Sequence, residues 1–282
     1  MSTVAMFPGQ GIAPSSVDRE EIAQALPELL AACEALLACD PFAMETWPTS
    51  VAQPLIYVAS LARWTMHRAS WRADWLIGHS LGELTALVAA GALDRMDGLR
   101  LVVRRGQLTE QAAAAAPSPT GMLALGCDAA TGETIAALAG AVVANDNAPA
   151  QVVLAGDAAA LQRAEDITRE RSLSCRRLTV GAAFHSPWMA GAMEPLAEEL
   201  HRCTFAPPQI PVISCITCRP IVDPYAELSG ALVASVRWRE LVLTLVERGA
   251  ERFEEVGPGT VLGKLVRRTI GRSVSVPAGG AR

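Results

Sequence analysis

The sequence has no long uncharged apolar run, although hydrophobic residues make up 51% of its 282 positions. A helix that spans a membrane needs about 20 consecutive apolar residues, and no stretch approaches that length. The first residues, MSTVAMF, also lack the basic segment and long apolar core of a secretory signal peptide. These two absences predict a cytoplasmic protein that does not associate with a membrane.

The sequence also lacks a cysteine pattern typical of disulfide-rich proteins and an excess of basic residues. The seven cysteines are scattered and odd in number, which argues against a disulfide framework. Cys215 and Cys218 form the one close pair, but zinc would need two further ligands at matching spacing, so we interpret both as reduced structural thiols. The formal net charge of −5 disfavours nucleic acid as a partner. The composition therefore indicates a cytoplasmic enzyme.

The most informative stretch is GHSLGE at residues 78–83, which follows a short apolar run and precedes a small-residue helix predicted over 84–92. Gly-x-Ser-x-Gly between a strand and a helix is typical of a nucleophile elbow, which holds the serine at the tip of a strained turn. Gly78 and Gly82 leave room where strand and helix nearly touch. A chance match in a glycine-rich chain is the alternative, but the flanking elements favour Ser80 as a nucleophile.

Four histidines could serve Ser80 as a general base. His67 and His201 fall on helices at positions typical of surface histidines. His79 adjoins the nucleophile, but neighbouring side chains at an elbow point to different sides, so we expect it to pack behind the turn. His185 lies in a loop at the junction of two predicted domains, where clefts form. Spacing alone favours His185 without deciding the question.

The pattern changes between residues 120 and 181, after the proline and glycine punctuation at 117–121. The order of predicted elements is β-α-β-β-α-β, which is typical of a ferredoxin-like unit inserted in a larger domain. Strands are predicted at 122–126, 141–144, 151–155 and 175–180, helices at 131–139 and 157–171, and a turn at 145–149. We therefore expect a small domain of residues 120–181 and a large α/β domain of residues 1–119 and 182–282.

The large domain is predicted to begin with a strand at 3–7 that runs into a glycine-rich turn at 8–11. Such a turn would line a site, although an ordinary turn is the alternative. Pro27 should divide residues 20–38 into two short helices. Further helices are predicted at 53–69, 94–116, 193–201 and 261–270, a mostly helical stretch at 228–249, strands at 212–216 and 253–259, and a frayed end at 278–282.

Six separate segments carry a family resemblance. They are FPGQG (7–11), GHSLGE (78–83), RG (105–106), ANDN (144–147), AFHS (183–186) and EVGPG (255–259). In this order they resemble the malonyl-CoA:acyl-carrier-protein transacylases, and in particular the acyltransferase domains of polyketide synthases. The resemblance covers about residues 3–270. It implies an α/β-hydrolase-like large domain with an inserted ferredoxin-like small domain.

The resemblance also implies the catalytic groups. Ser80 would be the nucleophile and His185 the general acid and base, with a backbone carbonyl around Arg248, rather than a carboxylate, orienting the imidazole. The backbone N–H groups of Gln10 and Leu81 would form the oxyanion hole.

Three further residues would contact the substrate. Arg105 would bind the free carboxylate of a malonyl group, because a planar guanidinium can bind both carboxylate oxygens, although an exposed helix charge beside Arg104 is the alternative. The Phe184 ring would fill the space that an α-methyl group needs. Asn147 would line the pocket.

The implied reaction is ping-pong transfer of a malonyl group from malonyl-CoA to the phosphopantetheine thiol of an acyl carrier protein, through an acyl-enzyme, in polyketide or fatty-acid synthesis. It needs no metal or redox cofactor, and we expect a monomer that meets its carrier protein in trans. One alternative is a hydrolase of the same fold that removes acyl groups from carrier proteins; Arg105 argues against it. Another is a silent scaffold, against which Ser80 and His185 argue.

Three features depart from the family pattern. The stretch between Gln10 and Ser80 is shorter than usual, so a helix or loop near the cleft mouth should be trimmed. Cys215 replaces the usual asparagine in the strand near residues 212–214, which leaves the local hydrogen bonding there open. No ketosynthase or carrier segment is fused to the chain, which predicts a free-standing enzyme.

Overall fold

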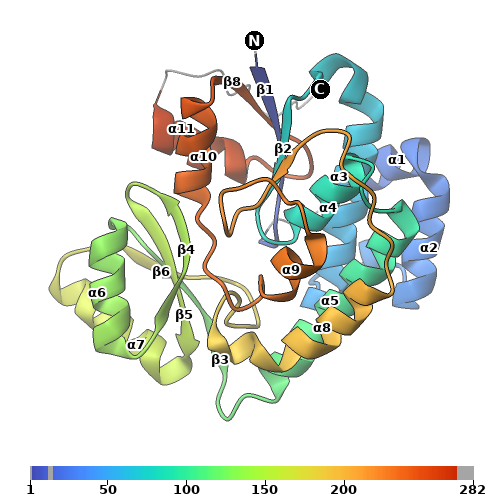
Figure 1. The fold of residues 1–282 in the computed structure, drawn as a ribbon. Coiled ribbons are helices and arrows are strands. Elements are labelled where there is room, and N and C mark those ends of the chain that lie inside the picture. Colours follow the sequence, from blue (N-terminus) through green and yellow to red (C-terminus); the bar gives the residue numbers. More distant parts are fainter. Residues whose placement is uncertain (1, 12–14, 272–282) are drawn as a thin grey trace.

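Two sheets with helices packed against them form the computed structural model, which describes residues 2–11 and 15–271 (Figure 1). The first sheet has the strand order β7-β2-β1-β8 and is parallel throughout. The second has the order β4-β5-β3-β6 and is antiparallel. The strands of the first sheet are β1 (Ser2–Phe7), β2 (Trp75–Gly78), β7 (Val212–Ile213) and β8 (Ala250–Glu255).

Helices lie on both sides of the first sheet because its central strands have no polar face. β1 and β2 are buried along most of their lengths, as is usual for parallel strands between two layers. Ala5 and Phe7 join one core, while Val4 and Met6 join the other. The first core contains residues of α1 (Ser16–Ala25), α2 (Pro27–Leu37), α3 (Thr49–Trp71), α4 (Gly82–Ala89) and α5 (Arg95–Ala114), and the second contains α10 (Trp238–Glu247) and α11 (Val261–Ile270).

The second sheet has the ferredoxin-like arrangement that the sequence predicts. Its strands and helices follow the order β3 (Thr120–Leu125), α6 (Ala129–Ala139), β4 (Val142–Ala148), β5 (Gln151–Asp157), α7 (Ala158–Glu170) and β6 (Cys175–Arg177). α6 and α7 cover one face, where Leu123 and Leu154 are buried. Met122 and Val153, on the opposite face, belong to the core of the large domain. The fold is therefore a large α/β domain with a small ferredoxin-like subdomain, and we propose residues 120–181 as its extent.

The remaining described elements are short. They are the 3₁₀ helices η1 (Pro41–Ala43) and η2 (Pro187–Ala192) and the helices α8 (Met193–His201) and α9 (Pro224–Ser229). Pro27 is the first residue of α2, so the predicted division of residues 20–38 is confirmed. Among the described residues, no helix is both long enough and apolar enough to cross a membrane. The frayed end predicted at 278–282 lies outside the described residues.

Two predictions about secondary structure were wrong. The run at 145–149 is not a turn, because β4 continues to Ala148 and pairs with β5, so that only Pro149 and Ala150 turn the chain. The stretch 228–249 is not mostly one helix, because α9 ends at Ser229, residues 230–237 are irregular, and α10 begins only at Trp238. Backbone pairing overrides the local pattern in both places. β5 pairs with residues 145–148 of β4, and Val236 N–H in the irregular segment donates to the carbonyl of Ala144.

Candidate active site

The turn between β2 and α4 has the geometry of a nucleophile elbow. Ser80, at its tip, has a φ angle of 54°, a left-handed conformation that is strained for a residue with a side chain. A Cβ on Gly78 would overlap the backbone of Gly82, and a Cβ on Gly82 would overlap the carbonyl of Phe7. The predicted need for glycine at both positions is therefore confirmed.

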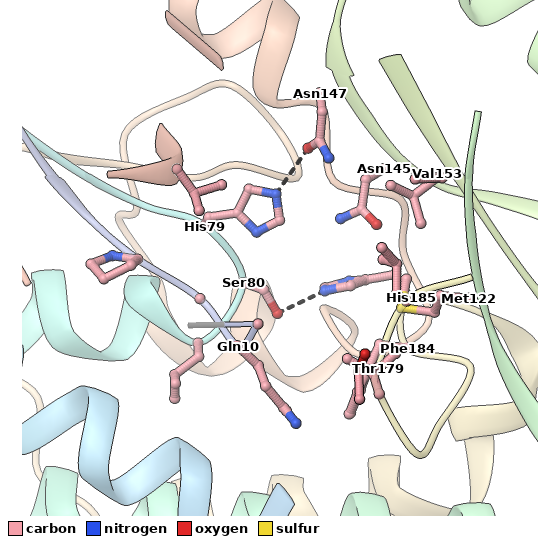
Figure 2. Close-up of a pocket in the computed structure, with 18 of the residues that line it drawn as sticks. Gln10, His79, Ser80, Met122, Asn145, Asn147, Val153, Thr179, Phe184 and His185 are labelled. Carbon is pink, nitrogen blue, oxygen red and sulfur yellow. Dashed lines mark hydrogen bonds between the residues drawn. The ribbon is translucent and has the colours of Figure 1, made fainter. Parts of the chain in front are cut away.

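Ser80 and His185 form a hydrogen-bonded pair, with 2.7 Å between Oγ and Nε2 (Figure 2). The other ring nitrogen, Nδ1, lies 3.0 Å from the carbonyl oxygen of Ala231 and 2.9 Å from that of Ala234. Because carbonyl oxygens only accept, Nδ1 must carry the proton, and Nε2 then presents a lone pair to the Ser80 hydroxyl. The expected carbonyl near Arg248 was the wrong one, since the acceptors are Ala231 and Ala234 in the segment before α10, whereas Arg248 follows that helix.

His185 is held in its neutral form by its surroundings. Burial is the largest cause that lowers its pKa from the ordinary 6.5 to about 3, and the charges of Arg105 and then His79 are the next causes. The side chain is only 4% exposed. A neutral imidazole with its tautomer fixed by two carbonyls can accept the proton of Ser80 as a general base.

Arg105 lies inside the site and not on the helix surface. It is 6% exposed, and its Nη2 donates to Ser80 Oγ at 3.0 Å. Burial lowers its pKa to about 10, and no carboxylate of the described residues lies within ion-pair distance of it. Arg104, by contrast, is 40% exposed in its side chain and pairs with Glu199 at 3.2 Å. The alternative of an exposed helix charge therefore holds for Arg104 and fails for Arg105.

Gln53 belongs to the site and was missed from the sequence. It is fully buried on α3, and its Oε1 accepts from Arg105 Nη1 at 2.6 Å. Its Nε2 donates to Gln10 Oε1 at 3.3 Å, and Gln10 Nε2 donates to Thr49 Oγ1 at 3.0 Å. This chain fixes the guanidinium. A glutamine on the otherwise apolar face of the helix predicted at 53–69 was the signal that could have found it.

The proposed oxyanion hole is geometrically available. Leu81 directly precedes α4, and Gln10 lies in the turn after β1. Both residues line the cavity that contains Ser80. Neither backbone N–H donates to another backbone group in the described part of the chain. The side chain of Gln10 points away from Ser80, so its backbone N–H is the group that it can offer there (Figure 2).

A cavity of about 430 Å³ separates the two domains at Ser80. Phe184 and Asn147 both line it, as the sequence predicts. Asn147 also binds His79, with 3.0 Å between Oδ1 and Nε2 (Figure 2). The ring of His79 lies 5.4 Å from that of Trp238. His79 therefore supports the elbow from the side and is not bonded to the Ser80 hydroxyl.

Comparison with known proteins gives the family to which this geometry belongs. The family model described as "Acyl transferase domain" matches residues 32–278. The chain belongs to the acyl transferase domain family. Its resemblance to the malonyl-CoA:acyl-carrier-protein transacylases is thereby confirmed.

Individual proteins of this family are similar to the chain over most of its length. The polyketide biosynthesis malonyl CoA-acyl carrier protein transacylase BaeC of Bacillus velezensis is 34% identical over 251 residues, which is 82% of this chain and 81% of that protein. The chain spans only 25% of the length of the polyketide biosynthesis protein ThaF of Burkholderia thailandensis, at 33% identity over 98% of its own length. The crystal structure of a malonyl-CoA:acyl carrier protein transacylase from Xanthomonas oryzae superposes with a TM-score of 0.88, at 33% identity over 98% of this chain and 94% of that one.

Cys215, which departs from the family pattern, supports the elbow. The backbone N–H of Ser80 donates to its Sγ at 3.4 Å. The backbone N–H of Cys215 donates to Glu83 Oε1 at 2.7 Å. Burial raises the pKa of Glu83 to about 7, and this carboxyl is 2% exposed. Cys215 and Cys218 are both buried and neither forms a disulfide.

Proposed function

We propose that this protein transfers a malonyl group from malonyl-CoA to the phosphopantetheine thiol of an acyl carrier protein, through an acyl-enzyme on Ser80. The family and the names of its relatives support the class of reaction. A further solved complex, of a type II polyketide synthase acyl-carrier protein with its malonyl-transacylase, is 29% identical with a TM-score of 0.88 and supports a carrier protein as the partner. BaeC, by its name, supports polyketide biosynthesis as the setting.

The geometry supports a ping-pong mechanism. His185 Nε2 accepts the proton of Ser80 Oγ as that oxygen attacks the thioester carbonyl. The N–H groups of Gln10 and Leu81 stabilise the oxyanion. When the C–S bond breaks, the CoA sulfur takes the proton from His185. The carrier thiol then gives its proton to His185, attacks the acyl-enzyme, and Ser80 Oγ recovers a proton from the same imidazole.

The observation that carries the choice of malonyl is that the buried guanidinium of Arg105 forms no ion pair within the described residues, although the charge of Glu83 acts to raise its pKa. A guanidinium that is removed from water and has no anionic partner is costly unless a ligand supplies one. Its Nη2 lies 3.0 Å from the oxygen that would carry the acyl group. A carboxylate separated from the thioester carbonyl by one carbon atom, as in malonyl, would reach it from there. A neutral acyl chain would leave the cation unpaired.

Mass spectrometry of the intact protein tests this proposal. Wild-type protein incubated with a panel of acyl-CoAs should gain the mass of malonyl, and Ser80→Ala should gain nothing. Addition of a holo carrier protein should then remove the mass and place it on the carrier. Loading of neutral acyl groups in preference to malonyl, with release to water instead of to the carrier, would favour the hydrolase instead.

A further inference from the structure

One edge strand of the small subdomain contacts the supports of both catalytic residues. β4 is at the edge of its sheet, and its free edge faces the irregular segment before α10 (Figure 1). Val236 N–H donates to the carbonyl of Ala144, and Asp146 N–H donates to the carbonyl of Val236, both at 2.8 Å. Ser235 Oγ adds a bond of 2.8 Å to the carbonyl of Val143. This segment therefore pairs with the free edge of β4 at one isolated parallel bridge, between Asn145 and Val236.

The same segment carries the two carbonyls that hold His185. Ala231 and Ala234 accept from Nδ1, and Val236 is fully buried two residues later. Between α9 and α10 the segment makes two turn hydrogen bonds of its own, from Ala231 N–H to Leu228 and from Val233 N–H to Gly230. Its bonds to β4 therefore help to fix where the two carbonyls lie.

An ion pair between β4 and α10 adds to the contact between the two domains, which we call the junction. Arg239, in the first turn of α10, donates to both carboxylate oxygens of Asp146 with Nε at 3.0 Å and with Nη2 at 2.7 Å. The side chains are 33% and 17% exposed, so the pair is partly shielded from water. A two-pronged arginine–carboxylate contact fixes geometry as well as charge. The next residue along β4, Asn147, binds His79 beside Ser80.

We propose that Asp146 and Arg239 are positioning residues for the general base. Their ion pair joins the small subdomain to the start of α10, directly after the segment of Ala231 and Ala234, and through that segment sets the orientation and tautomer of His185. Neither residue touches the reacting atoms. The small subdomain then helps to position the catalytic pair, in addition to lining the substrate cleft. This inference rests on the roles of Ser80 and His185 in the proposed function.

The test compares Asp146→Asn and Arg239→Gln with a matched control, Asp166→Asn. Asp166 pairs with Arg169 at 2.8 Å, and its hydrogen bonds among the described residues stay within α7, so the control removes the same charge from the same subdomain. Each variant is assayed well below its melting temperature, by the rate at which a fluorophosphonate labels Ser80 and by kcat and KM for malonyl transfer. Labelling needs His185 and no malonyl group, so it reports on the base alone.

We expect both junction variants to lower the labelling rate and kcat together by about ten- to a hundredfold, as a small misplacement of a catalytic group does, with KM for malonyl-CoA nearly unchanged. Asp166→Asn should match wild type, and the exchanged pair Asp146→Arg with Arg239→Asp should recover part of the rate. Labelling and kcat at wild-type values in both single variants would overturn the proposal. A wild-type protein that is labelled but does not load malonyl would contradict the proposed substrate, while slower labelling in the junction variants would still support the positioning role.

Discussion

Ser80 and His185 adopt the same uncommon backbone conformation, with φ angles of 54° and 56°, while their Oγ and Nε2 atoms lie 2.7 Å apart. Left-handed conformations of residues with side chains cost free energy and persist only where the surrounding structure imposes them. At Ser80 two glycines and the thiol of Cys215 impose it. At His185 the two carbonyls of the segment before α10 hold the ring in place.

The first prediction concerns this pair. Ser80→Ala should abolish acyl-enzyme formation, and His185→Ala should slow it by several orders of magnitude, because a neutral hydroxyl is a weak nucleophile without its base. Stopped-flow or intact-mass measurement of acylation checks both. His79→Ala should keep most of the activity, since His79 bonds to Asn147 and not to Ser80. Near-normal acylation by His185→Ala would show that the base is wrongly assigned.

The second prediction concerns pH. The positive charge of Arg105 is the second-largest cause of the low pKa of His185, after burial. Its removal in Arg105→Ala should raise that pKa from about 3 toward the ordinary 6.5, so the neutral base is lost at a higher pH as the solution is acidified. The pH dependence of fluorophosphonate labelling should show its acid limb shifted upward in Arg105→Ala. Arg104→Ala should leave the limb in place, and an unmoved limb in Arg105→Ala would contradict the electrostatic coupling.

The third prediction concerns Glu83 and stability. Its pKa is about 7 in the folded protein against an ordinary 4.5, so between these values the folded state binds more protons than the unfolded state. Wild-type stability should therefore lose this contribution as the pH rises from 4.5 through 7. In Glu83→Gln this pH dependence of stability should disappear. The free energy of unfolding of the variant minus that of wild type should therefore rise across that window by up to about 3 kcal/mol. Urea unfolding at several pH values checks this, and a constant difference would show that Glu83 does not titrate there.

The fourth prediction concerns branching at the malonyl α-carbon. Phe184 is 7% exposed and lines the cavity at Ser80. Wild type should prefer malonyl-CoA over methylmalonyl-CoA, by about 1–3 kcal/mol, which is the usual value of one methyl group. Phe184→Ala should reduce the preference by opening the space. Competition between the two CoA esters, read by intact mass, measures it, and equal loading by the wild type would remove the basis of this prediction.

The sequence was enough to predict the elements that repeat a recognisable local pattern. The elbow glycines, the order β-α-β-β-α-β and the six segments placed Ser80, His185 and Arg105, which the structure brings together within hydrogen-bond distances. Each of these depends on residue types at fixed spacing.

The supports of the site were harder to predict because they carry little or no side-chain signal. The acceptors of His185 Nδ1 are backbone carbonyls of two alanines in an irregular segment, and alanine side chains say nothing about their carbonyls. Asp146 and Arg239 are 93 positions apart and meet only through the packing of two domains. Glu83 and Gln53 did have a signal, since a polar residue on an apolar helix face needs a buried partner.

The central claim is that Arg105 selects a carboxylate-bearing acyl group, and competitive loading of malonyl-CoA and acetyl-CoA tests it most directly. The measurement is the ratio of the two acyl masses on Ser80 in wild type, Arg105→Ala and Arg104→Ala. Wild type and Arg104→Ala should load malonyl. Arg105→Ala should lose about 2–4 kcal/mol of stabilisation for malonyl transfer while acetyl loading stays equal or improves, because a charge-assisted pair is lost for one and a buried unpaired cation is removed for the other. A wild type that prefers acetyl or longer neutral chains, or an Arg105→Ala variant with an unchanged ratio, would contradict the account.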